Sequence, residues 1–285
     1  MTLLATRRRH RRRFAVLVPG VVIACYVLVA VFGPMVVRYN PLDTPLQDRL
    51  LSPGRNTADG GTALLGTDAL GRDIFAQIVY GARTSVTIGA VVVLICVVIG
   101  LLVGFVAGWY RGAVDMILTR LVDILQAFPG ILLAIVIAGV FTPGVGVIVL
   151  ALSVTGWISF ARVARSVVLG LRERYWIDAA RITGVRTVRL LRRHLLPFTV
   201  GPVVAMATLE FALIVLAEAG LSFLGIGLPT SSVSWGQTIA NGKAYLSTAW
   251  WISAAPGIAL SLLVISVGVL GDELTARYGR SRDSR

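Results

Sequence analysis

The stretch from Thr84 to Trp109 reads TSVTIGAVVVLICVVIGLLVGFVAGW and holds no charged side chain in 26 residues. An α-helix rises 1.5 Å per residue, so this stretch would extend about 39 Å as a helix. The hydrocarbon core of a bilayer is about 30 Å thick, and about 20 apolar residues cross it. The stretch therefore predicts a transmembrane helix.

Five further apolar runs share this character. The six together lie near residues 14–37, 84–109, 117–140, 145–165, 199–222 and 251–270. The composition agrees, since 56% of the residues are hydrophobic, 14% are charged and the mean hydropathy is +0.82. Ordinary soluble domains carry about 25% charged residues. We expect an all-α membrane protein with six transmembrane helices.

The basic residues are unevenly distributed along the chain. The net charge of +13 would suit nucleic-acid binding, so the position of the charge decides its meaning. The two tails, the connections after the second and fourth runs and the ends of the runs beside these connections hold 21 basic residues, and the other connections hold 6. The positive-inside rule places the richer set in the cytoplasm. We therefore expect both termini in the cytoplasm. We also expect the chain to be surrounded by lipid and not to bind nucleic acid.

This orientation divides the chain into segments. They are a basic cytoplasmic tail (1–13), a first transmembrane helix (14–37), an extracytoplasmic loop (38–83), a five-helix core (84–270) with a cytoplasmic loop (166–197), and a cytoplasmic tail (271–285). The cytoplasmic loop is far longer than a turn between two spans needs to be.

No motif in the sequence provides chemistry of its own. Lys243 follows Gly242, but the spacing of a phosphate-binding loop is missing, as are the common metalloprotease and serine-hydrolase motifs. Cys25 and Cys96 lie in separate apolar runs and match no metal-ligand spacing. We expect no catalytic residue, no metal site and no cofactor in this chain, and no enzymatic activity.

Gly100, Gly104 and Gly108 recur every four residues on one face of the second run. Small residues at this spacing allow membrane helices to approach closely. Packing within this chain is the simpler interpretation, and a contact with another subunit is the alternative.

Two acidic residues lie in the fifth run. An unpaired charge such as Glu210 near the centre of a span costs roughly 2.5 to 3.5 kcal/mol, so it should face protein or water. Glu210 is therefore either a pathway residue or a buried residue hydrogen-bonded to a neighbouring helix. Glu218 lies nearer the outer end, where partial hydration is expected.

The tryptophans near the outer end have two interpretations. Trp250 and Trp251, at the edge of the last run, favour an interfacial aromatic belt. Trp235 is flanked by Ser234 and Gly236 and favours packing within a loop.

The loop 166–197 contains a helical pattern. Tyr175, Ala179 and Ile182 recur at helical spacing and would form a short apolar face among arginines. Gly184 can end this helix in a left-handed turn, and Pro197 suits the first turn of the next span. Such a helix could lie on the membrane surface or dock in the groove of a partner.

Seven residues of this loop carry a specific resemblance. The pattern resembles the cytoplasmic "EAA" loop of ABC importer permeases, with aspartate in place of the usual glutamate. The matching positions are Asp178, Ala179, Ala180, Gly184, His194, Leu196 and Pro197.

Two further motifs resemble the C-type permease subunits of dipeptide, oligopeptide and nickel importers. They are GTDALGRD at 66–73 followed by YGARTS at 80–85, and EAGLSFLGIG at 218–227 followed by SWG at 234–236. Ala127-Phe128-Pro129 also fits. Three separated motifs in order are hard to explain by coincidence.

The resemblance implies a type I ABC importer permease fold in a bacterial-type cytoplasmic membrane. It implies a second homologous permease subunit, two cytoplasmic ATPases that bind ATP and Mg, and an extracytoplasmic solute-binding protein. Peptides or related small solutes would be the substrates, and the 178–197 loop would couple the spans to the ATPases. The alternative is a proton-coupled secondary transporter that uses Glu210.

Overall fold

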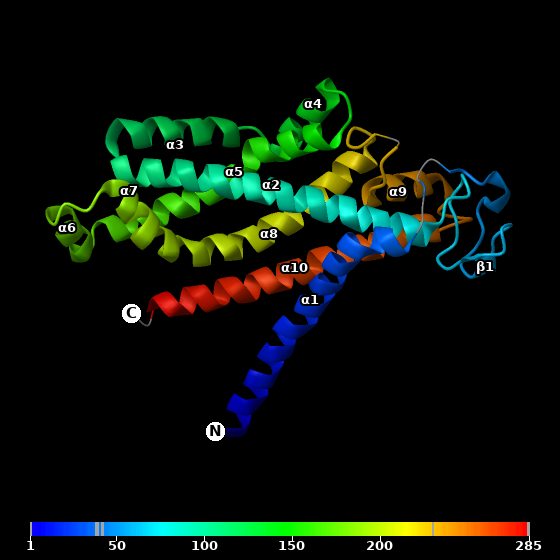
Figure 1. Ribbon diagram of the computed structural model, residues 1–285, viewed down its shortest axis with the longest axis horizontal. Helices are drawn as coiled ribbons and strands as arrows, with labels where there is room; N and C mark the ends of the chain where they lie inside the picture. Colours follow the sequence, from blue (N-terminus) through cyan, green and yellow to red (C-terminus); the bar gives the residue numbers. More distant parts are fainter. Residues whose placement is uncertain (1, 38–39, 41–42, 230, 284–285) are drawn as a thin grey trace.

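The computed structural model describes residues 2–37, 40, 43–229 and 231–283, which form an elongated bundle of helices (Figure 1). Arg38 and Arg285, counted above for the orientation, lie outside the described residues. The elements in chain order are α1 (Thr2–Val36), η1 (Leu46–Asp48), β1 (Arg55–Asn56), β2 (Thr62–Ala63), α2 (Ile74–Tyr110), α3 (Gly112–Gln126), α4 (Gly130–Val140), α5 (Val145–Arg172), α6 (Tyr175–Ile182), α7 (Thr187–Leu190), η2 (Leu191–Leu195), α8 (Leu196–Phe223), α9 (Trp235–Gly242), η3 (Lys243–Tyr245) and α10 (Trp251–Asp283).

Five helical segments of the described chain are long and apolar enough to cross a membrane. They are Val16–Val36, Ile74–Tyr110, Val145–Arg172, Thr187–Phe223 and Trp251–Ala276. A sixth is added if α3 and α4 are counted as one broken span. The protein is therefore helical with five to six apolar spans.

The run 117–140, predicted as one straight helix, is divided in two. Its halves α3 and α4 meet at a bend of 77°. Pro129, which immediately precedes α4, has no N–H to donate and disfavours helical backbone at Phe128. The apolar pattern continues through this break, so hydropathy alone does not reveal it.

Several helices extend beyond the apolar runs that predicted them. α2 begins at Ile74, ten residues before the predicted span, so the preceding loop is shorter than 38–83. α5 continues to Arg172 into the loop predicted at 166–197, and the rest of that loop is largely helical. Polar residues such as Gln77 and Arg172 lower the local hydropathy without preventing a helix.

The core is built around α2 and α5, the most extensively paired helices of the bundle. The three glycines of α2 face α5. A Cβ at Gly100 would lie 2.5 Å from the Cβ of Phe160, and one at Gly108 would lie 2.9 Å from the Cβ of Val168. A Cβ at Gly104 would lie 2.4 Å from the carbonyl oxygen of Ala161. The glycines therefore permit a backbone-to-backbone approach within this chain.

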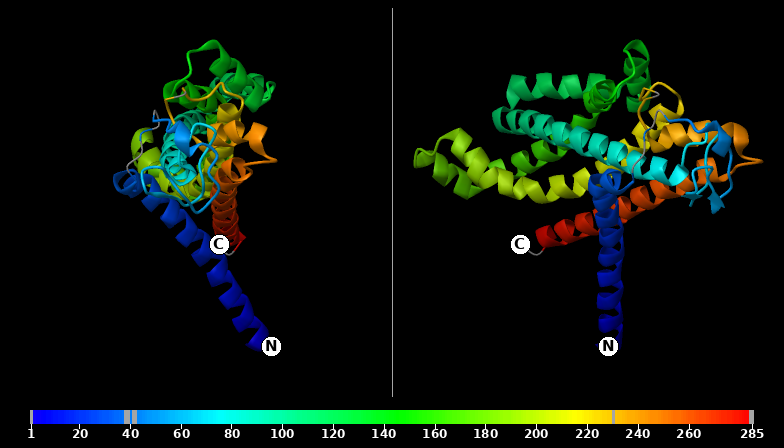
Figure 2. Two further views of the ribbon diagram at one scale, coloured as in Figure 1. Left: turned by 90° about the vertical axis from the view of Figure 1, so that its right-hand side faces the viewer. Right: turned by 45° about the vertical axis from the view of Figure 1, so that its right-hand side comes forward.

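Helix α1 leaves the bundle at a steep angle, as Figure 2 shows. It packs on α2 and α10 near its C-terminal end, where Ala30 is buried. Only 11% of the most apolar 18-residue stretch of α1 is buried against the rest of the chain. Most of its apolar surface is therefore left for lipid or another subunit.

Asp73 begins α2. Its carboxylate accepts hydrogen bonds from the backbone N–H groups of Phe75 (2.7 Å) and Ala76 (3.2 Å), which satisfies two donors of the first turn. Burial raises the pKa of Asp73 above its ordinary value, although these two hydrogen bonds lower it. The folded protein therefore holds the proton of Asp73 more tightly than the unfolded chain does. As the pH rises above the unfolded-state pKa, ionisation of Asp73 lowers the stability of the folded protein.

We expect Asp73→Ala to lower the free energy of unfolding by about 1 kcal/mol, because the cap is lost. Asp73→Asn keeps the accepting oxygen without the buried charge and should be as stable as the wild type at pH 7. Thermal unfolding of the purified proteins measures both. Equal losses in the two variants would contradict the capping role.

Candidate functional site at the two ends of the bundle

The helix α6 lies at one end of the bundle, and α9 and the β1–β2 hairpin lie at the other (Figure 1). α6 is anchored by Ile177, which is fully buried with Val168, Leu190 and Leu195. The opposite side of α6 is uncovered, with Tyr175 93% and Ile182 87% exposed. The structure thus places the predicted apolar face outward, on a helix fixed from behind.

Asp178 lies in the first turn of α6. Its carboxylate is 3.6 Å from the Arg181 guanidinium, and its side chain is 58% exposed. Gly184 follows the helix with φ of +78°, and the N–H of Val185 donates to the carbonyl of Ala180 at 3.0 Å. This left-handed turn favours glycine and ends the helix.

Trp109 joins α6 to the end of α2, a role that the sequence did not indicate. The Arg181 guanidinium lies 4.5 Å from the Trp109 ring centroid, within cation–π range. Arg172 donates a hydrogen bond to the Trp109 carbonyl. In the sequence, the position of Trp109 at the end of an apolar run indicates only a tryptophan at the membrane interface, not a contact with α6.

The remaining residues of the predicted loop lie where α7 leads into α8. The His194 ring is 5.7 Å from the Trp176 ring of α6. Pro197 lies in the first turn of α8, next to Leu196, and a π-helical turn precedes it. Proline removes one backbone hydrogen bond and crowds the preceding turn, which a π-helical turn accommodates. The segment 175–197 thus forms one packed unit at the α6 end.

Arginines cover the outer surface of this unit. Arg186, Arg189, Arg192 and Arg193 line a shallow hollow of about 390 Å³ together with Val188. Within the described part of the chain, none of the four forms an ion pair. The surface around α6 and α7 is therefore strongly basic.

Glu218 is fully buried at the other end of the bundle. Its carboxylate accepts hydrogen bonds from Ser85 of α2 (2.8 Å) and Ser222 of α8 (2.9 Å). The expected partial hydration is therefore wrong, because serine hydroxyls replace water around this group. Glu210 is partly buried, beside Ser159 of α5.

The two outer motifs found in the sequence meet in space. Thr238 of α9 donates to the Gln77 side chain at 2.9 Å, and the Gln77 amide donates to Asp68 at 3.0 Å. The Arg72 guanidinium closes the network on Asp68 at 2.6 Å. These contacts fasten the outer loop and α9 to α2.

Two tryptophans complete this fastening. Trp235 is fully buried in the outer cluster, and its indole donates to the carbonyl of Ile78 at 3.0 Å. Trp251 donates to the carbonyl of Thr67 at 3.2 Å and is also buried. Trp235 is therefore buried as the first residue of α9 and packs against α2, whereas the prediction placed it within a loop. The aromatic belt is wrong for Trp251. Trp250 remains exposed.

We expect Glu218→Ala to lower the melting temperature more than Glu218→Gln does. The alanine leaves the Ser85 and Ser222 hydroxyls without an acceptor, a loss of about 1–3 kcal/mol. The glutamine retains one accepting oxygen. Thermal unfolding in detergent measures the difference, and equal melting temperatures for all three proteins would contradict the network.

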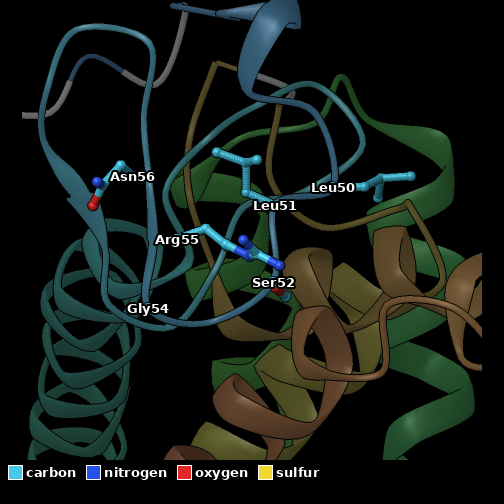
Figure 3. A pocket seen from close by; sticks show the side chains of 6 residues that line it. All are labelled: Leu50, Leu51, Ser52, Gly54, Arg55 and Asn56. Carbon is cyan, nitrogen blue, oxygen red and sulfur yellow. The ribbon is translucent and has the colours of Figure 1, made fainter.

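The outer loop also contains an open hollow of about 650 Å³. Figure 3 shows Arg55 extending toward Ser52, with Leu50 and Asn56 on either side. Arg55 has no ion pair among the described residues. The hollow thus presents an unpaired cation at the end opposite α6.

The bundle, with apolar spans between two polar ends, defines a helical integral membrane protein. Residues 97–280 match the family of binding-protein-dependent transport system inner membrane components. The chain belongs to this family and is an ABC importer permease located in the inner membrane.

Individual relatives agree along nearly the whole chain. It is 38% identical to a putative peptide transport system permease protein of Brucella suis, over 94% of this chain and 88% of the relative. It is 36% identical to the dipeptide transport system permease protein DppC of Bacillus subtilis, over 95% and 82%. The fold is similar to the MetNI methionine ABC transporter in an inward-facing conformation, with a TM-score of 0.60 and 20% identity over 72% of this chain and 97% of that chain.

Proposed function

We propose that this chain is a transmembrane subunit of an ATP-driven importer that carries dipeptides, oligopeptides or related small solutes across the cytoplasmic membrane. The observation that carries the proposal is the 38% identity to a putative peptide permease, which covers most of both chains. The chain then contributes the pathway, and separate subunits hydrolyse ATP.

The proposed topology has six spans with both termini in the cytoplasm. It counts α3 and α4 as one broken span. From the outer-loop end of the bundle, α1 and α10 both extend back toward the α6 side, which supports a common side for α6 and the far ends of these two helices (Figure 1). The concentration of arginines there supports the cytoplasm as that side.

α6 is the proposed docking element of this chain for one of two ATPase subunits that bind ATP and Mg, and the second permease would dock the other. It is exposed on one face, anchored by Ile177 on the other, and continuous with α8 through the packed segment 175–197. A displacement of α6 would therefore reach a membrane span directly. Coupling requires such a unit to have two states that the partner binds differently.

A second homologous permease and an extracytoplasmic binding protein complete the proposed assembly. The uncovered apolar surface of α1 supports a contact with the second permease or lipid. The outer loop is folded by its own hydrogen bonds and presents Arg55, which supports a docking surface for the binding protein.

The experiment is a pull-down from membranes with the chain tagged. Wild type is compared with the double variant Asp178→Arg/Ile182→Glu, which changes only the exposed face of α6. We expect wild type to recover a second permease and the ATPases, and the variant to recover the second permease with markedly less ATPase. Failure of wild type to recover an ATPase would contradict the proposal.

A further inference from the structure

A hollow of about 270 Å³ lies between α2, α3 and α5. Its apolar side combines three small residues with three larger ones: Gly104, Ala107, Ala161, Val103, Leu118 and Val122. Its polar side contains Thr119 and Asp123 of α3 and Arg162 and Arg165 of α5. A carboxylate on α3 and a guanidinium on α5 thus lie at the edge of a small, partly apolar hollow.

Two ion pairs join α3 to α5, and they differ in geometry. Arg165 binds Asp115 with two hydrogen bonds of 2.6 and 2.7 Å, which closes that pair. The Arg162 guanidinium is 3.6 Å from the Asp123 carboxylate, too far for a hydrogen bond. Within the described chain, neither the Asp123 nor the Arg162 side chain forms a hydrogen bond. The N–H groups of Arg162 and the carboxylate oxygens of Asp123 are therefore available to hydrogen-bond a ligand.

The position of the open pair indicates its surroundings. Both side chains are about half exposed, at 54% for Arg162 and 51% for Asp123. They lie on segments that belong to candidate spans. Charged side chains inside spans face protein or water, because lipid does not solvate them. The hollow therefore opens toward a wet pathway or another subunit.

The lining specifies a ligand with two opposite charges. A carboxylate binds an ammonium group, and a guanidinium binds a carboxylate with charge-assisted hydrogen bonds. The volume is slightly below the roughly 300–1,000 Å³ of sites for drug-sized ligands. A hollow of this volume with an apolar side suits a short peptide that carries small side chains.

We propose that this hollow binds a short peptide by its two ends, with the ammonium group at Asp123 and the carboxylate at Arg162. The inference rests on the proposed function and adds a zwitterion site within the permease to it. The loose ion pair would separate to admit the peptide. Asp115 and Arg165 would hold α3 against α5 beside the ligand.

The test measures binding of labelled Ala-Ala to the assembled permease–ATPase complex without the binding protein. The complex is held in phosphatidylglycerol bilayers, which contain no amine head group that could occupy the same pair. Acetyl-Ala-Ala and Ala-Ala-amide each lack one charge and should bind wild type about tenfold more weakly or worse. Nucleotide-free and ATP-analogue states are both measured.

Two variants assign the ends of the peptide. With Asp123→Asn, Ala-Ala should bind weakly and acetylation should cause no further loss. With Arg162→Gln, amidation should cause no further loss. Arg120→Gln, on α3 but outside the lining of the hollow, is the matched control and should bind like wild type.

Coupled uptake with the binding protein present is measured on the same preparations. A complex that takes up Ala-Ala with ATP but binds none directly in either state would overturn the zwitterion site and leave the importer intact. Equal binding by wild type and both variants would also overturn it. Absence of ATP-dependent uptake in wild type would instead count against the proposed function.

Discussion

Replacing Gly104 by valine is expected to disrupt the packing of α2 against α5 and to destabilise the folded protein strongly. A Cβ at this position would lie 2.4 Å from the Ala161 carbonyl oxygen and 2.6 Å from the Ala164 Cβ. Both neighbours belong to the backbone or its first side-chain atom, so neither can rotate away. The helices must separate, and the contacts of the most extensively packed helix pair are lost.

We expect a loss of about 3 kcal/mol or more, at or above the upper range of ordinary overpacking, and a fall in melting temperature on the order of 10 °C. Thermal unfolding in detergent, followed by size-exclusion chromatography, measures it. Gly170→Val is the matched control, because a Cβ at Gly170 of α5 would meet no atom within 4 Å. Equal melting temperatures for the two variants would contradict the role of Gly104.

Reversing the charge at Asp178 is expected to reduce ATP-driven uptake to about a tenth or less while the permease still folds. Asp178 is exposed, and among the described residues its one ion pair is the loose contact with Arg181, so we expect folding not to depend on it. If a cation of the partner pairs with Asp178 in the proposed docking surface, the reversal places like charges together, at a cost of several kcal/mol. Asp178→Glu keeps the sign and should retain most of the uptake.

Substitutions at Gly184 test the same segment through the conformation of the backbone rather than through charge. Its φ of +78° is costly for most side chains, and asparagine is among the few residues that tolerate it. We expect Gly184→Trp to uncouple ATP hydrolysis from uptake, whereas Gly184→Asn should remain coupled. Hydrolysis and uptake are measured together in reconstituted vesicles. Normal coupling in both Asp178→Arg and Gly184→Trp would count heavily against α6 as the coupling element.

The helical membrane class could be predicted because it depends on long apolar runs that are local in the sequence. The bend between α3 and α4 could not be predicted from hydropathy, since Ile131 and Leu132 continue the apolar pattern directly beyond Pro129. The extension of α2 to Ile74 was also missed. Its first turns are stabilised by the Asp73 cap and by contacts of Gln77 with distant residues.

The polar contacts at the two ends depend on residues far apart in the chain. Ser85 and Glu218 are 133 positions apart, and their hydrogen bond gives no local signal. Trp251 has the sequence context of an interfacial belt, but its partner Thr67 lies in a loop 184 positions away. The α6 segment was easier to predict, because its helical spacing and terminating Gly184 are local features.

The deciding measurement is uptake of labelled Ala-Ala into vesicles that contain the purified complex, with ATP supplied either inside or outside. It distinguishes ATP-driven import from proton-coupled transport. We predict uptake that requires ATP on the α6 side and the binding protein on the other. It should persist when a protonophore collapses the pH gradient and when Glu210 is changed to glutamine. Uptake without ATP that the protonophore or Glu210→Gln abolishes would contradict this account and establish a proton-coupled transporter.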